Sequence, residues 1–337
     1  MRSSLAILVL AYATCAVSER LRVLEDICNG STLTTREGQA IELKARKQPG
    51  QIIDTFAFGN KFEIEVLLLR LYEMGDEVAE FHIVEGDRDF TGSPKEYEFD
   101  LVRGKLDAWK HKITYHKAKI PAGVKDYDLQ NAQRLSMDSE MKSTPRDPAD
   151  VLLEGDLDEI VHHRTLQVLR NCEPASGAWN TRIRMGNFYY TIGWTTGDWE
   201  HPTTASFFSE DHPAKWSTSF TSSTSGMSSF AEAKAIWDRP NLLSSRDGPT
   251  GWHLGWILNG AEGLARKIFL LVEGRPVWAR DYKDEAALAK FLKSSFYANP
   301  QSYDYKIYPS QVHKDDVPQA LLEHPEEFPT ILRGVTL

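Results

Sequence analysis

The sequence predicts an α/β fold, in which a mixed, Rossmann-like sheet is flanked by helices. The first observation is an apolar strand candidate, Ile52–Phe58, followed by Lys61–Met74, whose dense Leu and Val suit a helix that stops at Gly75. Val78–Glu85 then suits a second strand. The order strand, helix, strand is typical of a parallel crossover and therefore of an α/β sheet.

The second observation is a short apolar run, Asp150–Leu153, that leads directly into a cluster of acids. In open α/β sheets, ligands bind beyond the carboxyl ends of the strands, because the connecting loops converge there. The sequence therefore predicts that Glu154–Glu159 forms a loop at the ligand-binding edge of the sheet.

Further elements complete the prediction. A helix is expected over Tyr127–Met141, since apolar residues recur on one face before Pro145 and Pro148. Residues 178–199 alternate aromatic and polar positions, which favours strands and a loop. A mobile surface loop is expected at residues 217–229, which are rich in Ser and Thr, and short helical pieces from Pro309 onward.

The N-terminus has the features of a signal peptide over residues 1–17. Arg2 precedes the apolar run Leu5–Val17, which has small residues near its end. A short signal anchor is the alternative, although this run is shorter than the roughly 20 residues of a typical bilayer span. We expect residues 18–50 to form a stem or linker, and residues 51–337 to form one catalytic domain.

Composition and cysteine content narrow the function. Of 337 residues, 41% are apolar and 26% are charged, as in soluble globular proteins, and the net charge of -9 argues against nucleic acid as a partner. Outside the signal segment there are two cysteines, Cys28 and Cys172, which either pair or stay as isolated thiols. Asn29-Gly30-Ser31 is an N-glycosylation sequon, in agreement with entry into the secretory pathway.

The acidic segment suits a divalent metal. Mg²⁺ and Mn²⁺ prefer carboxylate oxygens, and such an ion neutralises the diphosphate that leaves a nucleotide sugar. Asp156 and Asp158 supply two carboxylates, either on one face of an extended segment or gathered by a turn. An Asp-x-Asp spacing alone also arises in solvated loops and helix caps.

Four separated motifs point to one family. They are Asp54-x-Phe56-x-Phe58-x-Asn60, the stretch from Val84 to Lys95, Glu154 to Ile160, and Gly251-Trp252-His253-Leu254-Gly255-Trp256. In this order they resemble the β-1,4-mannosyl-glycoprotein 4-β-N-acetylglucosaminyltransferases, the bisecting enzymes of glycosyltransferase family 17. The resemblance covers roughly residues 51–330. Leu254 differs, since the animal enzymes have Cys at this position.

The resemblance implies a fold of GT-A type and a complete reaction. It implies an inverting, metal-dependent enzyme that transfers N-acetylglucosamine from UDP-GlcNAc, with Mn²⁺ or Mg²⁺, in β-1,4 linkage to a mannose of an N-glycan core. The expected location is the Golgi lumen, or outside the cell if the signal is cleaved. The expected metal ligands are Asp156, Asp158 and His253, and the residues expected near the donor are Asn60, Glu63, Glu85, Lys95 and Arg184.

Several of these roles have an alternative that the sequence leaves open. Lys95 either offsets phosphate charge or pairs with a neighbouring acid, and Arg184 contacts either the acceptor or a structural acid. His253 is either a metal ligand or a histidine of the core. An inverting reaction requires a base to take the acceptor proton, and the candidates are Glu159, Asp198 and Glu200.

Two other functions compete with this prediction. One is a GT-A transferase with a different donor or acceptor. The other is an inactive, secreted glycan-binding protein that uses aromatic side chains such as Tyr189 and Trp194 as its binding surface. A retaining glycosidase is disfavoured, because it requires two opposed carboxylates and no metal motif.

Overall fold

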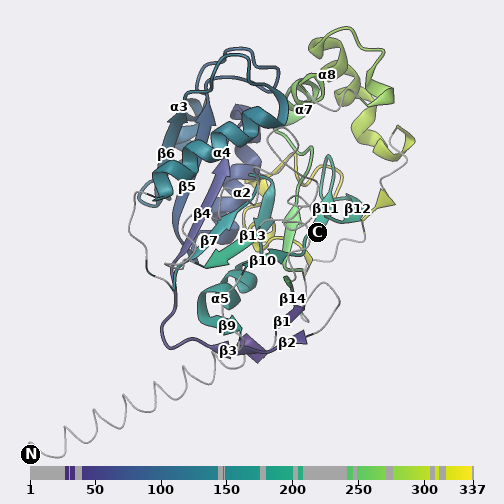
Figure 1. Cartoon of the computed structure of the whole chain (residues 1–337). Helices are drawn as coiled ribbons and strands as arrows, with labels where there is room; N and C mark the ends of the chain where they lie inside the picture. Colours follow the sequence, from purple (N-terminus) through teal and green to yellow (C-terminus); the bar gives the residue numbers. More distant parts are fainter. Residues whose placement is uncertain are drawn as a thin grey trace, which may run out of the picture.

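The chain forms a mixed α/β structure built on three sheets (Figure 1). The computed structural model describes residues 27–29, 31–34, 40–142, 147, 149–174, 180–199, 204–207, 241–245, 249–270, 276–303, 308–310 and 316–335. The predicted signal segment at residues 1–17 and the predicted loop at residues 217–229 lie outside these ranges. The described part of the chain contains no helix that has both the length and the apolar composition of a bilayer span.

Four parallel strands form the half of the largest sheet that carries the predicted ligand edge. Their order is β6-β5-β4-β7, and their bounds are Ile113–Ala118, Val78–Gly86, Ile52–Ala57 and Val151–Glu154. Helix α2 (Ile64–Met74) connects β4 to β5, and a 3₁₀ turn, η1 (Lys61–Glu63), precedes it. The predicted crossover is therefore confirmed. From β4 the chain proceeds to β5 and β6 on one side and later returns as β7 on the other.

The remaining strands of this sheet are mostly antiparallel. They follow β7 in the order β13, β10, β14, β1 and β2, with bounds Thr204–Phe207, Asn180–Ile183, Asn241–Ser245, Ser31–Thr34 and Ala40–Ile41. Only β10 and β14 form a parallel pair among these neighbours. The predicted mixed sheet is thus confirmed.

Helices cover both faces of the parallel strands, which explains why these strands are almost continuously apolar. Helix α4 (Asp126–Lys142) lies across one face (Figure 1), where Leu129 and Met137 pack with Ile53 of β4. Side chains alternate between the two faces along a strand. Ile52 and Phe56 of β4 therefore point to the opposite face from Ile53, where they pack in the same core as α2. The predicted helix at Tyr127–Met141 is confirmed.

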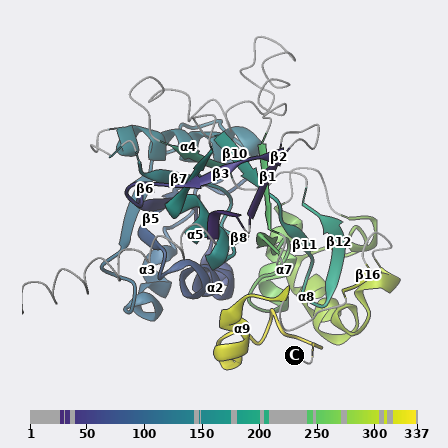
Figure 2. The same cartoon turned by 90° about the horizontal axis from the view of Figure 1, so that it is seen from below.

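A second sheet of five short strands lies on another side of the molecule, next to two helices (Figure 2). Its order is β16-β12-β11-β15-β8, with bounds Tyr308–Pro309, Trp194–Asp198, Gly186–Phe188, Gly251–His253 and Glu159–Val161. Helices α7 (Gly260–Phe269) and α8 (Glu285–Ser294) enclose a separate core around Tyr190 and Phe296. Tyr190 is buried in that core, so it is not part of a sugar-binding surface.

The N-terminal segment corrects the predicted stem. Strands β1 and β2 extend the large sheet, and β3 (Leu43–Ala45) pairs with β9 (Cys172–Pro174). Cys28 and Cys172 form a disulfide with their Cα atoms 5.6 Å apart, which resolves the pairing that the sequence left open. The folded part therefore begins well before Gln51. Short polar strands of this kind have too few residues to show a period in the sequence.

The other elements are short. Helices α3, α5 and α9 span Phe99–Val102, His163–Asn171 and Gln319–Glu323. The remaining 3₁₀ turns are Arg103–Leu106, Val277–Ala279, Phe296–Ala298, Pro300–Ser302 and Pro325–Glu327. The expectation of short helical pieces near the C-terminus is confirmed.

Candidate functional site

The candidate site lies where the connections of the parallel sheet change direction. The chain leaves β4 toward β5 on one side, whereas β7 pairs with β4 on the other side. The loops that follow β4 and β7 therefore leave the same edge of the sheet, and in open α/β sheets ligands bind at such a switch point. The first loop contains Asn60 and Glu63, and the second contains the acidic segment up to Glu159.

A buried arginine shapes the acidic loop. Arg70 of α2 donates to both carboxylate oxygens of Asp54 on β4, at 2.7 and 2.6 Å, and both side chains are fully buried. Its remaining terminal nitrogen, Nη1, donates to three carbonyl oxygens of the loop, those of residues 156, 157 and 159. The planar guanidinium is suited to this, because it presents five donors in a fixed geometry. Arg70 thus fixes the backbone that carries the acids.

Asp158 faces two basic side chains that come from distant segments. Its Oδ1 lies 3.7 Å from Nε2 of His253 on β15, and its Oδ2 lies 3.5 Å from Nζ of Lys267 on α7. Burial raises the pKa of Asp158, but Lys267 and His253 outweigh this effect, so the pKa is below its usual value. The Asp158 side chain is ionised at neutral pH and remains 19% exposed.

The orientation of His253 is set by Asn187 and Trp199. Asn187 Nδ2 donates to Thr196 Oγ1, which leaves Asn187 Oδ1 as the acceptor for His253 Nδ1 at 2.6 Å. The proton is therefore placed on Nδ1, and Nε2 is directed toward Asp158. The indole of Trp199 stacks on the imidazole, with ring centroids 3.7 Å apart. A histidine held through one nitrogen in this way is typical of a metal ligand.

Glu159 lies on the same face of the second sheet as His253, because the two residues are paired across β8 and β15. Its Oε1 accepts the Trp199 indole N–H at 2.5 Å, and its Oε2 accepts the Asp156 backbone N–H at 3.1 Å. Burial and then the charge of Asp156 raise the pKa of Glu159 to about 8, despite the hydrogen bond from Trp199. Glu159 thus connects the acidic loop to the ring that supports His253.

Asp156 points to a different partner. Its Oδ1 accepts from Arg134 Nη2 at 2.5 Å and from Gln130 Nε2 at 3.0 Å, both on α4. The ligand atoms of Asp156, Asp158 and His253 do not all lie within 4.8 Å of one another, although the structure describes all three residues. Of the three predicted metal ligands, the structure therefore brings Asp158 and His253 together and ties Asp156 to α4.

Asn60 and Glu63 form a capping box at the start of η1. Asn60 Oδ1 accepts the Phe62 N–H at 2.9 Å, and Glu63 Oε2 accepts the N–H groups of Gly59 and Asn60. Burial raises the pKa of Glu63 to about 7 against the opposing charge of Lys267, and Asp158 raises it further. The two predicted donor residues therefore shape this loop, and Glu63 shares the electrostatic field of Asp158 and Lys267.

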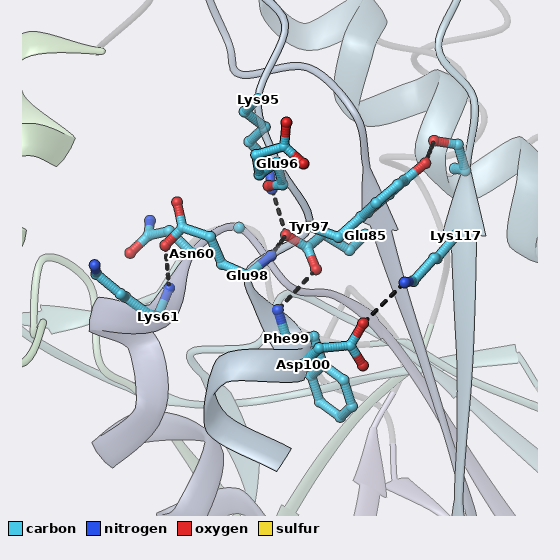
Figure 3. A network of polar contacts seen from close by, with 12 residues as sticks. Asn60, Lys61, Glu85, Lys95, Glu96, Tyr97, Glu98, Phe99, Asp100 and Lys117 are labelled. Atoms are coloured by element: carbon cyan, nitrogen blue, oxygen red, sulfur yellow. Dashed lines mark hydrogen bonds and ion pairs between the residues drawn. The ribbon is translucent and has the colours of Figure 1, made fainter.

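Glu85 and Lys95 pair with each other (Figure 3). Glu85 is fully buried, and besides Lys95 Nζ it accepts the backbone N–H groups of Glu98 and Phe99 and the hydroxyl of Tyr115. These four donors satisfy its carboxylate from every side. Of the two roles that the sequence allows for Lys95, the structure shows the pairing with a neighbouring acid. Glu85 and Lys95 together anchor the loop after β5.

Arg184 and Asp198 also pair with each other, at an exposed position. The distance from Arg184 Nη2 to Asp198 Oδ2 is 2.7 Å, and the two side chains are 54% and 62% exposed. Arg184 therefore contacts an acid, which is one of the two roles expected for it. Glu200, the third candidate base, lies outside the described residues. Of the two candidates that the structure describes, Glu159 is the one placed beside Asp158 and His253.

The raised pKa of Glu159 predicts a pH dependence of stability. The folded state keeps the Glu159 proton up to about pH 8, whereas the unfolded chain releases it near the ordinary pKa of a glutamate, 4.5. The resulting stability is present below pH 4.5 and is lost as the pH rises through 8. We expect the free energy of unfolding to fall over this interval by on the order of a few kcal/mol.

The measurement is urea unfolding of the wild type and of Glu159→Gln between pH 5 and 9, in EDTA. Glutamine also loses a matched acceptor for Trp199 or for the Asp156 N–H, so we expect Glu159→Gln to be less stable than the wild type at acid pH. The informative quantity is the slope of the free energy of unfolding against pH. This slope should be shallower in Glu159→Gln than in the wild type. Equal slopes in the two proteins would contradict the assignment.

Sequence reasoning missed three residues that the structure adds to the site. Lys267 lies on an amphipathic helix, where a lysine is most often solvated, and nothing in its sequence context marks it. Asn187 lies in a short strand of mixed composition. Arg70 had a usable signal, since it is the one basic residue within the apolar helix sequence of α2, and Asp54 is the one charged residue within β4. A buried charge of this kind requires an opposite charge nearby.

The comparison with known families gives one match. The family description "Glycosyltransferase family 17" fits residues 23–224, which include β1 to β13 and the whole acidic segment. No curated protein matches the chain at a significant level.

Proposed function

The chain belongs to glycosyltransferase family 17, and from this premise we propose that it is an inverting enzyme of GT-A type that transfers N-acetylglucosamine. The proposed donor is UDP-GlcNAc, and the proposed acceptor is a mannose of an N-glycan core, joined in β-1,4 linkage. The proposed location is the secretory pathway, in the Golgi lumen. The observation that carries the proposal is the convergence of Asp158, His253 and Lys267 at the switch point of the sheet.

Asp158 and His253 fit a divalent cation. Two ligands of one ion, each about 2.1 Å from it, lie at most about 4.2 Å apart, and the measured separation is 3.7 Å. Carboxylate oxygen and imidazole nitrogen are both ligands that suit Mn²⁺, and Nε2 of His253 faces the carboxylate of Asp158. Such an ion, when bound, neutralises the charge that develops on the diphosphate as UDP leaves. Asp158 and His253 are therefore the residues proposed to hold Mn²⁺ or Mg²⁺.

Lys267 supplies a further positive charge at the same place. In this structure its ammonium group lies near the carboxylates of Asp158 and Glu63. A diphosphate bound beside Asp158 is within the field of this ammonium, which attracts the negative phosphate oxygens. We assign to Lys267 the role of stabilising the diphosphate in the donor and in the departing UDP.

Removal of this charge should weaken donor binding. We expect Lys267→Ala to raise the KM for the nucleotide sugar by about tenfold, which corresponds to about 1.4 kcal/mol, while Lys267→Arg retains most of the affinity. The measurement is initial-rate kinetics with varied donor at saturating Mn²⁺. Lys293, in the last turn of α8, is a matched exposed lysine, and its Ala variant should behave as the wild type. Unchanged donor KM in Lys267→Ala would remove Lys267 from the site.

The acceptor proton requires a carboxylate base. In the proposed reaction the acceptor hydroxyl oxygen forms a bond to the anomeric carbon, its proton passes to the base, and the bond to UDP breaks on the opposite face. Glu159 is the candidate base beside Asp158, and burial gives it a pKa of about 8, close to the working range of a general base. Its hydrogen bonds to Trp199 and to the Asp156 N–H hold it in place for this role.

A donor screen tests the proposal. UDP or GDP release is measured with UDP-GlcNAc, UDP-galactose, UDP-glucose and GDP-mannose, each with an N-glycan acceptor and with Mn²⁺ or EDTA. We expect turnover with UDP-GlcNAc and Mn²⁺, and its loss in EDTA. Turnover with another donor only would replace the proposed donor. Glycan binding without turnover of any donor would favour a glycan-binding protein instead.

A further inference from the structure

A second group of potential metal ligands lies at the contact between α2 and α5. Glu73 is in the last turns of α2, His162 is the N-cap of α5, and His163 is its first residue. One ligand atom from each of these three residues lies within 4.8 Å of the other two. In the part of the chain that the structure describes, no other group of three His, Cys, Asp or Glu side chains has its ligand atoms this close together.

This cluster is separate from the candidate active site. His162 follows β8 in extended conformation, and its N–H continues the pairing with the neighbouring segment by donating to Thr250 O. Side chains alternate along such a strand, so Glu159 points to one face and His162 to the other. On this other face the His162 ring lies 5.2 Å from the ring of Trp252, whereas Glu159 pairs with His253.

The distances and the ligand types suit Zn²⁺. Glu73 Oε1 lies 3.0 Å from His163 Nδ1, and the rings of His162 and His163 are 4.3 Å apart at their centroids. Ligands at about 2.0–2.1 Å around a tetrahedral ion are separated by roughly 3.3 Å, so small side-chain rotations suffice. Two imidazoles and one carboxylate are ligand types that zinc commonly takes, with water able to complete a tetrahedral shell.

The surroundings prepare the three side chains for a cation. The Glu73 side chain is 1% exposed, and its Oε2 is held by the backbone N–H of Gln319 at 2.9 Å. The His163 side chain is 30% exposed, which leaves a path from solvent. A carboxylate that is already held in place by a backbone N–H needs little rearrangement to bind a cation.

We propose that Glu73, His162 and His163 form a structural Zn²⁺ site, distinct from the cation site of the candidate active centre. The ion links α2 to α5 directly. Through the hydrogen bond of Glu73 to Gln319, it also secures the C-terminal segment 316–335, which packs on α2. Zinc binding therefore stabilises the fold without a role in sugar transfer.

A second histidine pair offers a control. His82 Nδ1 lies 3.1 Å from His116 Nε2, and His82 Nε2 lies 2.9 Å from Glu80 Oε2. The partners are on opposite sides of the His82 ring, so they cannot bind one ion together. His116→Gln therefore removes a histidine from a Glu-His-His group and should leave Zn²⁺ binding unchanged.

The experiment uses the full chain, stripped of metal with EDTA, and titrates Zn²⁺ by calorimetry and by thermal unfolding. His162→Asn keeps an N-cap acceptor for α5, and His163→Gln keeps a donor to Glu73, so both variants should fold. Asp158→Asn removes a ligand of the other cation site. We expect Asp158→Asn, in which the other cation site has lost a ligand, to bind one Zn²⁺ with a raised Tm, and the wild type and His116→Gln to keep this binding event.

Loss of an outer-shell partner alone typically weakens metal binding by about 10–100-fold, so loss of a ligand in His162→Asn or His163→Gln should weaken it by more than 100-fold. Equal Zn²⁺ affinity in the wild type and in the double variant His162→Asn/His163→Gln would overturn the proposal. If the variants do not fold, Co²⁺ added to Asp158→Asn decides: intense tetrahedral absorption bands support the site, and their absence overturns it. These outcomes do not depend on glycosyltransferase activity.

Discussion

Replacement of Asp158 by Asn is expected to lower kcat/KM for the proposed transfer by about 10³-fold, which corresponds to about 4 kcal/mol of transition-state stabilisation. The carboxylate of Asp158 is the acid that faces both His253 and Lys267, at 3.7 and 3.5 Å. An amide of the same shape carries no charge, so it holds a divalent cation poorly and no longer pairs with the ammonium group.

The measurement is UDP release at several Mn²⁺ concentrations, together with the folded-state circular dichroism spectrum. Asp100→Asn is a matched control, because Asp100 is also an aspartate paired with a lysine, Lys117, but at an exposed position with 45% of its side chain accessible. Asp100→Asn should retain the wild-type rate. If Asp158→Asn retained more than a tenth of the activity with the same Mn²⁺ requirement, Asp158 would not be a ligand of the ion.

Asp156 has two alternative roles in the acidic motif: it either holds the loop against α4 or binds the ion together with Asp158. Its carboxylate is bound by Arg134 and Gln130 of α4, so its role in this structure is to hold the loop against that helix. We therefore expect Asp156→Asn to have a smaller effect on activity than Asp158→Asn. Equal losses in both variants, with the same weakening of Mn²⁺ activation, would indicate that Asp156 turns toward the ion when the donor binds.

Replacement of Arg70 by Met is expected to lower the free energy of unfolding by about 3–5 kcal/mol, since it leaves Asp54 as a buried carboxylate without a counter-charge. The pair is fully buried. Arg70 also donates to three loop carbonyls, and methionine has no donor for them. The double variant Arg70→Met/Asp54→Leu should regain part of this loss, because it removes the unpaired charge but leaves the carbonyls unsatisfied.

Urea unfolding of both single variants, the double variant and the wild type measures this coupling as a double-mutant cycle. Lys44→Met is the control, because Lys44 pairs with Glu173 at the surface, where an ion pair contributes at most about 1 kcal/mol. Arg70→Lys should also have a lowered free energy of unfolding, since an ammonium group cannot form the two parallel hydrogen bonds of a planar guanidinium. A loss below about 1 kcal/mol in Arg70→Met would contradict the proposed function of this buried pair.

Local sequence patterns predicted the main elements well. The apolar runs of β4, β5 and β7 and the helices α2 and α4 were all recognised within a few residues, because burial on a helix or strand has a short period in the sequence. The short strands β1, β2 and β3 were assigned to a stem instead. Strands of two to four residues are too short for a period, and their stability comes from pairing with segments far away in the chain.

The sequence by itself determined the α/β core, the place of the acidic segment at the end of β7, and the residue types of a cation site. These properties depend on neighbours along the chain. Only the tertiary structure decided which acid faces which base. Lys267 reaches Asp158 across 109 residues of sequence, whereas Arg134 of α4 takes Asp156. The physical reason is that electrostatic and hydrogen-bond partners are selected by proximity in space, which the packing of β8, β15 and α7 establishes.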